Sequence, residues 1–411
     1  MKRKFLIIGL GKSGLAIVRY LIQNNKNIVV AVDAQAKEKS FHHHNLCPIF
    51  CDDHEFSLFD FDFVILSPGI SLCHSLCREA IQRKIPIMGE VEFSVQQMLE
   101  HERTMIGITG SNGKSTISMM VTHILQQSGH KVKCVGNIGI PLISVIHDDP
   151  SWMFVVELSS FQLETMKTPC FDVAVILNLF ENHLDRHDNM NNYFCVKRNI
   201  GNVLKPNGLF GIQGDLVDHY NSFLRDVQYQ RVDGDFVEFI ADHYCVSKRE
   251  VARWRETFCP LSHRLQYVGC IEGMKCYNDS KATNPAAVVY AVRQIGRSII
   301  LLLGGRKKIG TSFLQCQKDF IGRVKMMIIF GESRATIAEE VEEFGIPMYL
   351  VQTLREGIQI GLKEGTIGDN FVLSPGCASF DEFFDFKKRG EYFKEELYNE
   401  SKRCGLYQRF D

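Results

Sequence analysis

The 411-residue chain is long enough for two or three domains. Its 45% of hydrophobic and 23% of charged residues are typical of a globular protein with an apolar core. A formal net charge of −1 offers no basic excess for a nucleic-acid backbone, and no apolar run approaches the roughly 20 residues that cross a bilayer, so we expect neither a nucleic-acid partner nor membrane insertion.

The amino-terminal stretch and the cysteines indicate a cytoplasmic protein. The apolar run Phe5–Ile8 follows basic residues, as in a signal peptide, but it breaks at Gly9 and Lys12, which is too soon for a secretory core. The 14 cysteines include no Cys-x-x-Cys pair and no regular spacing. We therefore expect reduced, mostly buried thiols, since a chain of this length does not need disulfides to fold.

The first segment reads as strand, glycine turn, helix and strand, which is a βαβ unit with a parallel sheet. Strands are expected at Lys4–Ile8, Ile28–Val32 and Val64–Leu66, with a helix that ends near Leu21. The turn, Gly9-x-Gly11-x-x-Gly14, together with Asp33 after the second strand matches the fingerprint of dinucleotide-binding proteins. A turn without a ligand, a nicotinamide cofactor and the pyrophosphate of a UDP group all fit this pattern.

The second segment carries a stronger signal, a loop from Thr109 to Thr116 between the strand Met105–Thr109 and the helix Lys114–Gln127. Its sequence is Thr-Gly-Ser-Asn-Gly-Lys-Ser-Thr, in which Gly110, Ser111, Asn112 and Gly113 could cradle phosphate oxygens with their backbone N–H groups. Lys114 would add positive charge at the β- and γ-phosphates, and the hydroxyl of Ser115 or Thr116 could bind Mg²⁺. The usual P-loop has Gly where this chain has Ile108, so the motif is a variant; the alternative is a glycine turn with an incidental lysine.

Three further side chains of this segment are candidates for the same site. Glu157 follows a buried strand, Met153–Val156, and strand ends in α/β sheets present ligands, although an ordinary strand-end carboxylate is the alternative. His183 lies in the loop after the strand Val173–Leu177, where a histidine is more often structural than catalytic. From the residues alone, Lys197 is interpreted as a surface lysine of a helix.

The third segment repeats the alternation of strands and helices, with apolar strands at Ile299–Leu303, Met326–Phe330 and Phe371–Leu373. No internal repeat or low-complexity region interrupts the chain. We therefore expect an α/β protein of three domains, at 1–91, 92–260 and 261–411: Rossmann-like at the amino terminus, a P-loop-type ATP-binding domain in the centre, and Rossmann-like again at the carboxyl terminus.

Taken together, these residues resemble the Mur ligase family, and the resemblance spans nearly the whole chain. The family pattern is a Thr-Gly-x-Asn-Gly-Lys-Ser/Thr loop followed by Glu, His and Lys, here Lys114, Glu157, His183 and Lys197. Asn278-Asp279-Ser280-Lys281-Ala282-Thr283-Asn284 is similar to the signature of the family branch that adds D-glutamate. Further matches are the segments 136–139, 157–164, 263–264 and 374–381.

The resemblance implies an ATP-dependent amide-bond ligase that adds D-glutamate to UDP-N-acetylmuramoyl-L-alanine in peptidoglycan synthesis. The γ-phosphate of ATP is transferred to the substrate carboxylate, and the amine of D-glutamate attacks the acyl phosphate to form a tetrahedral intermediate. Phosphorylation removes the negative charge that makes a carboxylate a poor electrophile and supplies a leaving group. The resemblance also implies two Mg²⁺ sites, at which Mn²⁺ could substitute. We also expect a monomer.

Roles for individual residues follow from the resemblance alone. For catalysis and metal binding, it implies Lys114 and Asn137, Ser115 or Thr116 with Glu157 at one Mg²⁺, and His183 with a carbamylated Lys197 at the other. For ATP, it implies the loop 110–116 and, at the domain junction, His263, Arg264, Asp279 and Lys281. For the UDP-linked substrate, it implies Lys12, Ser13, Asp33, Ser67, Gly69, Asn137 and Ser159. For D-glutamate, it implies Thr283, Lys308, Ser379, Phe380 and Phe386, of which both phenylalanines could instead be core residues.

The chain departs from the family pattern at several places. Ala34 and Gln35 follow Asp33 where Thr and Arg are usual, and Asn182 replaces an Asp. Arg306-Lys307 interrupt a Gly-Gly-Asp-Gly-Lys run before Lys308. The usual His-Asn-x-x-Asn helix start, which helps to hold adenine, is not recognisable between residues 215 and 239, so adenine contacts are not assigned.

Three rival functions remain open at this stage. A nicotinamide-dependent oxidoreductase would explain the first glycine motif but not the Lys114 loop. A regulatory nucleotide-binding protein would bind ATP without releasing phosphate. A sister ligase would use another amino acid. For the ligase, we also expect hinged domains whose closure excludes water from the acyl phosphate.

Overall fold

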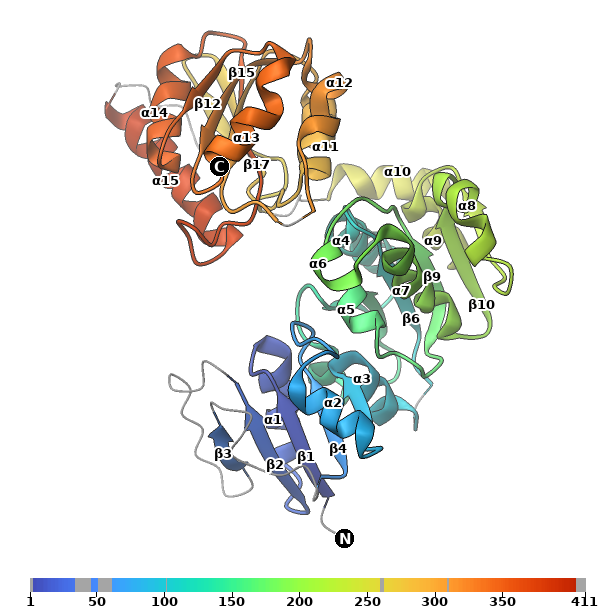
Figure 1. Ribbon diagram of the computed structural model, residues 1–411. Helices are drawn as coiled ribbons and strands as arrows, with labels where there is room; N and C mark the ends of the chain where they lie inside the picture. The colour runs from blue at the N-terminus through green and yellow to red at the C-terminus, as the bar shows by residue number, and fades with distance from the viewer. Residues whose placement is uncertain are drawn as a thin grey trace. The chain divides into compact units, whose positions relative to one another are not determined.

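The computed structural model describes residues 3–33, 46–50, 61–100, 102–258, 262–308 and 310–403, with the backbone alone for 46–50 and for 185. The chain divides into two compact units. The first contains Met1–Leu179 and Asp188–Phe258, and the second contains Phe180–His187 and Cys259–Asp411. The first unit holds two β-sheets and the second holds one (Figure 1).

The first sheet is parallel throughout and follows the order β3-β2-β1-β4-β5. Alternate residues of its strands point to opposite faces, so α1 and α3 cover one apolar face and α2 covers the other. The helix α1 buries Gly14, Ile17, Val18 and Leu21, which lie on one side of a helix. The elements are β1 (Arg3–Ile8), α1 (Lys12–Ile22), β2 (Asn27–Val32), β3 (Leu46–Phe50), β4 (Phe63–Leu66), α2 (Ser75–Gln82), β5 (Ile87–Gly89) and α3 (Glu90–Met98).

The second sheet is also parallel and follows the order β11-β10-β9-β6-β8-β7. Its strands are β6 (Met105–Thr109), β7 (Val132–Gly136), β8 (Met153–Glu157), β9 (Phe171–Ile176), β10 (Leu204–Gln213) and β11 (Gln230–Val232). One face packs against α4 (Lys114–Gln127), α9 (Phe236–His243) and α10 (Lys248–Glu256). The remaining elements are η3 (Leu142–Val145), α5 (Ser160–Leu163), α7 (Met190–Asn202), α8 (Gly214–Tyr220) and η4 (Asn221–Phe223).

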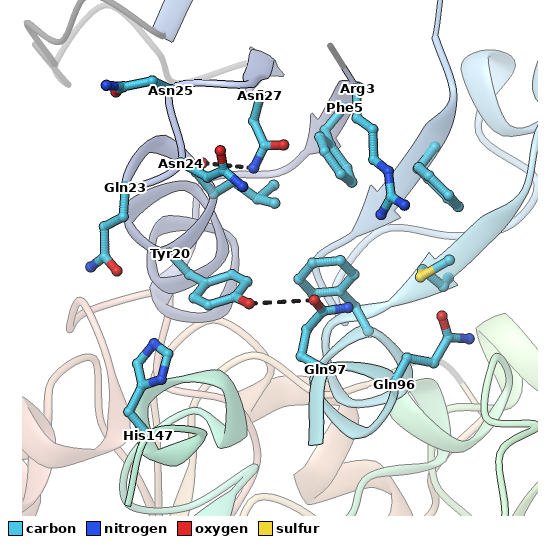
Figure 2. Close-up of a pocket in the computed structure, with 14 residues that line it drawn as sticks. Arg3, Phe5, Tyr20, Gln23, Asn24, Asn25, Asn27, Gln96, Gln97 and His147 are labelled. Atoms are coloured by element: carbon cyan, nitrogen blue, oxygen red, sulfur yellow. Dashed lines mark hydrogen bonds between the residues drawn. The ribbon is translucent and has the colours of Figure 1, made fainter. Parts of the chain in front are cut away.

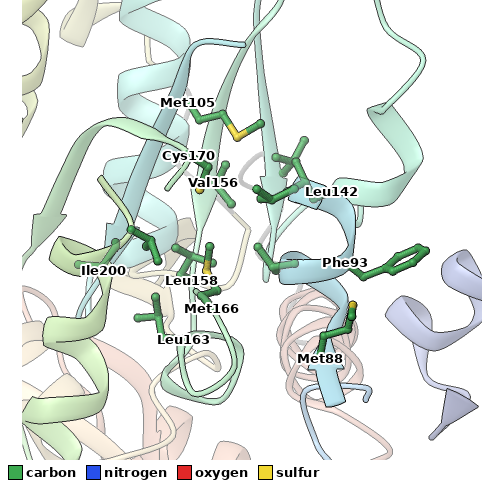
Figure 3. Close-up of a cluster of buried hydrophobic side chains, with 14 of the residues drawn as sticks. Met88, Phe93, Met105, Leu142, Val156, Leu158, Leu163, Met166, Cys170 and Ile200 are labelled. Carbon is green, nitrogen blue, oxygen red and sulfur yellow. The ribbon is translucent and has the colours of Figure 1, made fainter. Parts of the chain in front are cut away.

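One apolar cluster joins the two sheets of the first unit. Met88 and Phe93, at the end of the first sheet and in α3, belong to the same buried cluster as Leu142 of η3 and Val156 of β8 (Figure 3). The buried carboxylate of Glu90, at the start of α3, also accepts a hydrogen bond from the Ile143 amide at 3.3 Å. The helix α3 therefore connects the first sheet, which carries the first glycine motif, with the second sheet, which carries the second motif.

The sheet of the second unit follows the order β12-β13-β17-β14-β15-β16, in which only β12 is antiparallel to its neighbour. Its strands are β12 (Gln266–Ile271), β13 (Met274–Asn278), β14 (Ile299–Gly304), β15 (Val324–Phe330), β16 (Met348–Leu350) and β17 (Asn370–Gly376). α11 (Pro285–Ile295), α12 (Gln317–Phe320) and α13 (Arg334–Val341) cover one face, while α14 (Leu354–Glu364) and α15 (Phe386–Arg403) cover the other. The shorter elements are α6 (Leu184–His187), η5 (Leu314–Cys316) and η6 (Glu342–Phe344).

The expected α/β class is confirmed, with three predominantly parallel sheets. Among the helices that the structure describes, none is both long and apolar enough to cross a membrane. The departures at Ala34 and Gln35 lie outside the described residues.

Candidate functional site

The loop of the second glycine motif connects β6 to α4 through two glycines with positive φ. Gly110 has φ 156° and Gly113 has φ 78°, a region that side chains with a Cβ rarely adopt. A Cβ on Gly110 would also lie 3.1 Å from the Cβ of Leu177, at the end of the neighbouring strand. The glycines thus allow the chain to turn tightly into the N-terminus of α4, where backbone N–H groups and the helix dipole favour a bound anion.

Asn178, immediately after β9 and Leu177, holds this loop in place. Its carbonyl accepts from the Ser111 amide at 3.0 Å, and its side-chain oxygen accepts from the Asn112 amide at 2.8 Å. Its side-chain nitrogen donates to the Asn112 carbonyl at 3.0 Å. Sequence reasoning did not single out Asn178; the available signal was an asparagine at the end of the strand that pairs with β6.

Lys114 lies over the same loop. Its Nζ donates to the carbonyls of Gly110 at 2.8 Å and Ser111 at 2.9 Å. The adjacent Ser115 is buried and Thr116 is half-buried at the start of α4. The loop therefore places a cation and a hydroxyl beside the helix N-terminus, the groups that hold the phosphates and Mg²⁺ of a nucleotide.

Lys197 is buried, and its interpretation from the residues alone as a surface lysine is wrong. Only 1% of this residue is exposed. Its Nζ donates to the Gly110 carbonyl at 2.9 Å and to Thr109 Oγ1 at 3.3 Å, and it lies 4.8 Å from the centre of the Tyr193 ring. Burial lowers the pKa of Lys197 well below its usual value, the nearby charge of Lys114 lowers it further, and only the Glu157 carboxylate opposes this.

Glu157 is the last residue of β8 rather than the residue after it, and it is also buried. Asn137 fixes its carboxylate, because Asn137 Nδ2 donates to Oε1 at 2.7 Å while the Asn137 amide donates to the Glu157 carbonyl at 2.9 Å. Among the described residues, Oε2 of Glu157 has no hydrogen-bond partner. A buried carboxylate oxygen without a donor suits a hard cation such as Mg²⁺.

The first unit thus brings together Lys114, Asn137, Glu157 and Lys197 around one loop. His183 lies in the segment Phe180–His187, which belongs to the second unit. It adopts φ 57° and its carbonyl accepts from the amides of Arg186 and His187, at the start of α6.

The turn of the first glycine motif is held by close packing within the motif and by hydrogen bonds to nearby side chains. Gly14 packs so tightly that a Cβ there would lie 2.0 Å from the Gly9 carbonyl oxygen. Asp33 Oδ2 accepts from the Leu10 amide at 2.6 Å, and Ser67 Oγ donates to the Gly9 carbonyl at 2.7 Å. Both predicted ligand-binding side chains therefore also shape the turn.

The other residues expected to bind the UDP-linked substrate lie near this turn or beside the second sheet. Lys12 Nζ donates to the carbonyl of Gly139, in the loop that carries Asn137. Ser13 is half-buried and Gly69 is exposed. Ser159 forms a capping box with Gln162 at the start of α5, so its hydroxyl already has a structural role.

The cavity shown in Figure 2 lies away from these residues. It has a volume of about 470 Å³ and is lined by, among others, Arg3, Asn27 and Tyr20. Arg3 and Asn27 begin β1 and β2, whereas the glycine motif follows the carboxyl end of β1. Because none of the predicted site residues lines it, we do not assign the cavity to the candidate site.

In the second unit, the segment 278–284 connects β13 to α11 and is anchored by buried side chains. Asp279 accepts from the Leu265 amide at 3.0 Å and from Ser374 Oγ at 2.8 Å, and burial raises its pKa to about 7. His263 is buried beside it, with φ 64°, and its carbonyl accepts from the Lys281 amide at 3.0 Å. Arg264 is half-buried.

The residues expected to bind D-glutamate lie around the carboxyl ends of the same strands. Lys308 Nζ donates to Asn182 Oδ1 at 3.2 Å, and both residues belong to the second unit. Lys281 Nζ lies 3.9 Å from the centre of the Phe386 ring. Phe380 is 65% exposed, which excludes the alternative that it is a core residue. Thr283 and Phe386 are half-buried, and Ser379 is buried.

Arg306 and Lys307, which interrupt the Gly-Gly-Asp-Gly-Lys run of the family pattern, form ion pairs within their own unit. Arg306 pairs with Glu332 at 2.8 Å, and Lys307 pairs with Glu340. These two cations therefore have partners next to Lys308. Within the part of the chain that the structure describes, no three His, Cys, Asp or Glu side chains gather as a metal site.

Nearly the whole chain is similar to known proteins. The family model of the MurD-like N-terminal domain of Mur ligases matches residues 3–89, and that of the Mur ligase middle domain matches residues 108–233. The UDP-N-acetylmuramoylalanine–D-glutamate ligase of Chlamydia pneumoniae is 33% identical over 96% of this chain and 98% of its own length. The ligase of the same name from Syntrophus aciditrophicus is 32% identical over 96% and 97%.

A solved structure supports the fold. MurF ligase from Thermotoga maritima, crystallised with ADP, superimposes with a TM-score of 0.60 at 15% identity, covering 97% of this chain and 99% of that one. The chain therefore belongs to the Mur ligase family, in the branch of the UDP-N-acetylmuramoylalanine–D-glutamate ligases.

Proposed function

We propose that this protein catalyses the ATP-dependent addition of D-glutamate to UDP-N-acetylmuramoyl-L-alanine in the synthesis of peptidoglycan precursors. The relatives that match nearly its whole length carry the name of this activity. The observation on the chain itself that carries the proposal is the convergence of Lys114, Glu157 and Lys197 at the loop between β6 and α4.

In the first step, the carboxylate of the UDP-linked substrate attacks the γ-phosphorus of ATP, and the bond to ADP breaks. Lys114 would give up its hydrogen bonds to the two loop carbonyls and bind the β- and γ-phosphates instead. Its positive charge would then stabilise the negative charge that develops on the phosphate oxygens in the transition state. In the second step, the amine of D-glutamate attacks the acyl phosphate. The tetrahedral intermediate then expels inorganic phosphate, and the amine loses its proton. Positioning by the loop would supply much of the rate enhancement.

The donor set near the loop fits Mg²⁺, which prefers oxygen ligands. Ser115 or Thr116 and the free Oε2 of Glu157 would hold one ion with ATP, and His183 with a modified Lys197 would hold a second; Mn²⁺ could replace either. When bound, the ions would neutralise phosphate charge.

We propose that Lys197 is carbamylated. An ammonium group is a cation and cannot ligate Mg²⁺, whereas the neutral amine can attack CO₂ to form a new N–C bond with loss of a proton. The buried position, with the pKa of Lys197 lowered, favours that neutral amine. The product is an anion with two oxygens, which suits both the cation site and the neighbouring charge of Lys114.

The remaining contacts are proposed by residue. The UDP-linked substrate would bind Asn137 and the residues around the first glycine turn, namely Lys12, Ser13, Asp33, Ser67, Gly69 and Ser159. ATP would bind the loop of residues 110–116 and, in the second unit, His263, Arg264, Asp279 and Lys281. D-glutamate would bind Thr283, Lys308, Ser379, Phe380 and Phe386, with the Lys308 cation facing its side-chain carboxylate.

We also propose three functional domains, at 1–91, 92–260 and 261–411, that close around the substrates, and a cytoplasmic monomer as the working form. The shared core of the first two sheets supports motion mainly between the unit that contains them and the second unit. X-ray scattering profiles that are identical with and without all ligands would contradict the closure.

The decisive test is a phosphate-release assay with ATP, Mg²⁺ and UDP-N-acetylmuramoyl-L-alanine, in which amino acids are added one at a time. Phosphate should appear only with D-glutamate, and the Lys114→Ala variant should abolish it. Release with another amino acid would indicate a sister ligase, ATP binding without release would indicate a regulatory protein, and bound NAD without ATP turnover would indicate an oxidoreductase.

A further inference from the structure

Arg389 is a fully buried arginine in α15, the helix that follows the segment 374–381. Its Nε donates to Ser280 Oγ at 3.0 Å, and its Nη2 donates to the carbonyls of Ser280 at 2.9 Å and Cys377 at 3.1 Å. One planar guanidinium thus joins the segment after β13 to the segment after β17.

The third nitrogen of Arg389 faces a third segment. Among the described residues, Nη1 has no hydrogen-bond partner, and a Cβ on Gly305 would lie 3.1 Å from it. Gly305 has φ 115° and follows β14, three residues before Lys308. The guanidinium therefore lies beneath the carboxyl ends of three adjacent strands of the sheet.

Neighbouring contacts reinforce this arrangement. Ser280 Oγ donates to the Phe386 carbonyl at 2.8 Å, and Asn278 Nδ2 donates to the Gly390 carbonyl at 3.0 Å. The first turn of α15 is thus bonded to the signature segment on both sides of Asp279. Within the described part of the chain, Arg389 has no ion pair within 4.0 Å, so its hydrogen bonds to neutral groups fix its position.

We propose that Arg389 is a positioning residue that fixes the segments 278–281 and 376–380 relative to each other and thereby sets the affinity for D-glutamate. Arg389 itself is buried and would not touch the substrate. The inference rests on the proposed function, because Lys281, Thr283, Ser379 and Phe380 are assigned to substrates there. A planar fork can hold two segments at once, whereas a lysine at the same place is a single-point donor.

Three variants test this proposal: Arg389→Met, which removes all the bonds, Arg389→Lys, which keeps the charge, and Ser280→Ala, which removes only the Nε contact and the bond to Phe386. We expect the KM for D-glutamate to rise about 10- to 100-fold in both Arg389 variants and less in Ser280→Ala, since small displacements of binding groups can cost up to about 100-fold. The KM for the UDP-linked substrate should change less than about twofold, because its proposed site lies in the first unit.

Arg293→Met is the matched control. It removes an arginine whose side chain makes two hydrogen bonds, both to Asp319 at 2.7 and 3.0 Å, on the surface of the same unit. Its KM values should equal those of the wild type. An unchanged D-glutamate KM in the folded Arg389 variants would overturn the proposal, and so would full activity of Arg389→Lys. If both Arg389 variants fail to fold, an unchanged KM in Ser280→Ala overturns it.

Hydrogen exchange separates this inference from the proposed function. Amides of residues 278–281 and 376–380 should exchange faster in Arg389→Lys than in the wild type or in Arg293→Met, whether or not any substrate turns over. Unchanged exchange at both segments would refute the positioning role even in an active enzyme, whereas a wild type that is inactive with D-glutamate would refute the proposed function alone.

Discussion

Replacing Asn178 with alanine would test how the loop of the second glycine motif is held. The substitution removes the two side-chain hydrogen bonds to Asn112, at 2.8 and 3.0 Å, and keeps the backbone bond to Ser111. The Asn112 N–H and C=O would lose these two bonds, so the loop could relax away from the conformation proposed to receive phosphate.

The magnitude follows from the two lost bonds. Each hydrogen bond contributes a net of about 0.5–1.5 kcal/mol, so together they contribute about 1–3 kcal/mol. If that free energy must be supplied when ATP orders the loop, the dissociation constant for ATP should rise about 5- to 150-fold. The KM for D-glutamate should change much less, because its proposed contacts lie in the second unit.

Titration calorimetry with a non-hydrolysable ATP analogue would measure this effect. Asn199→Ala is a matched control, because Asn199 also donates two hydrogen bonds to backbone carbonyls, those of Leu163 at 2.8 Å and Met166 at 2.9 Å, but away from the loop. We expect Asn199→Ala to lower the free energy of unfolding while leaving nucleotide affinity unchanged. Equal nucleotide affinity in Asn178→Ala and Asn199→Ala would refute the reasoning.

Two further predictions concern buried ionisable groups. If Lys197 is carbamylated, removing CO₂ and bicarbonate at constant pH should lower activity, and mass spectrometry under non-acidic conditions should detect the adduct; an unmodified Lys197 in fully active enzyme would contradict this. Burial raises the pKa of Glu90 from 4.5 to about 7, so the native state holds a proton that the unfolded state releases. The stability that this proton contributes is complete below pH 4.5 and is lost as the pH rises through 7, which amounts to up to about 3 kcal/mol. Glu90→Gln should therefore gain stability relative to the wild type between pH 5 and pH 8 in urea denaturation, and an equal difference at both pH values would show that Glu90 does not titrate in this range.

Much of the secondary structure follows from local sequence. The strand Met105–Thr109 and the helix Lys114–Gln127 have the predicted bounds, because a short, mainly apolar run, a glycine turn and a long helical pattern follow one another there. Other strands are longer than predicted: Val324–Phe330 and Asn370–Gly376 extend beyond their apolar centres, since pairing with neighbouring strands fixes residues that have no apolar signal of their own.

By itself, the sequence determined the α/β class, the glycine loop between β6 and α4 and the resemblance to Mur ligases, because glycine turns and strand patterns are encoded within a few consecutive residues. Only the tertiary structure shows that Lys197 is buried and that its pKa is lowered. Only the tertiary structure shows, too, that Asn178 forms hydrogen bonds with a loop residue 66 positions away and that Arg389 forms hydrogen bonds with two segments that follow different strands. These properties depend on which distant residues the fold brings within hydrogen-bond distance and how much water it excludes, and neither quantity is encoded in the local pattern around each residue.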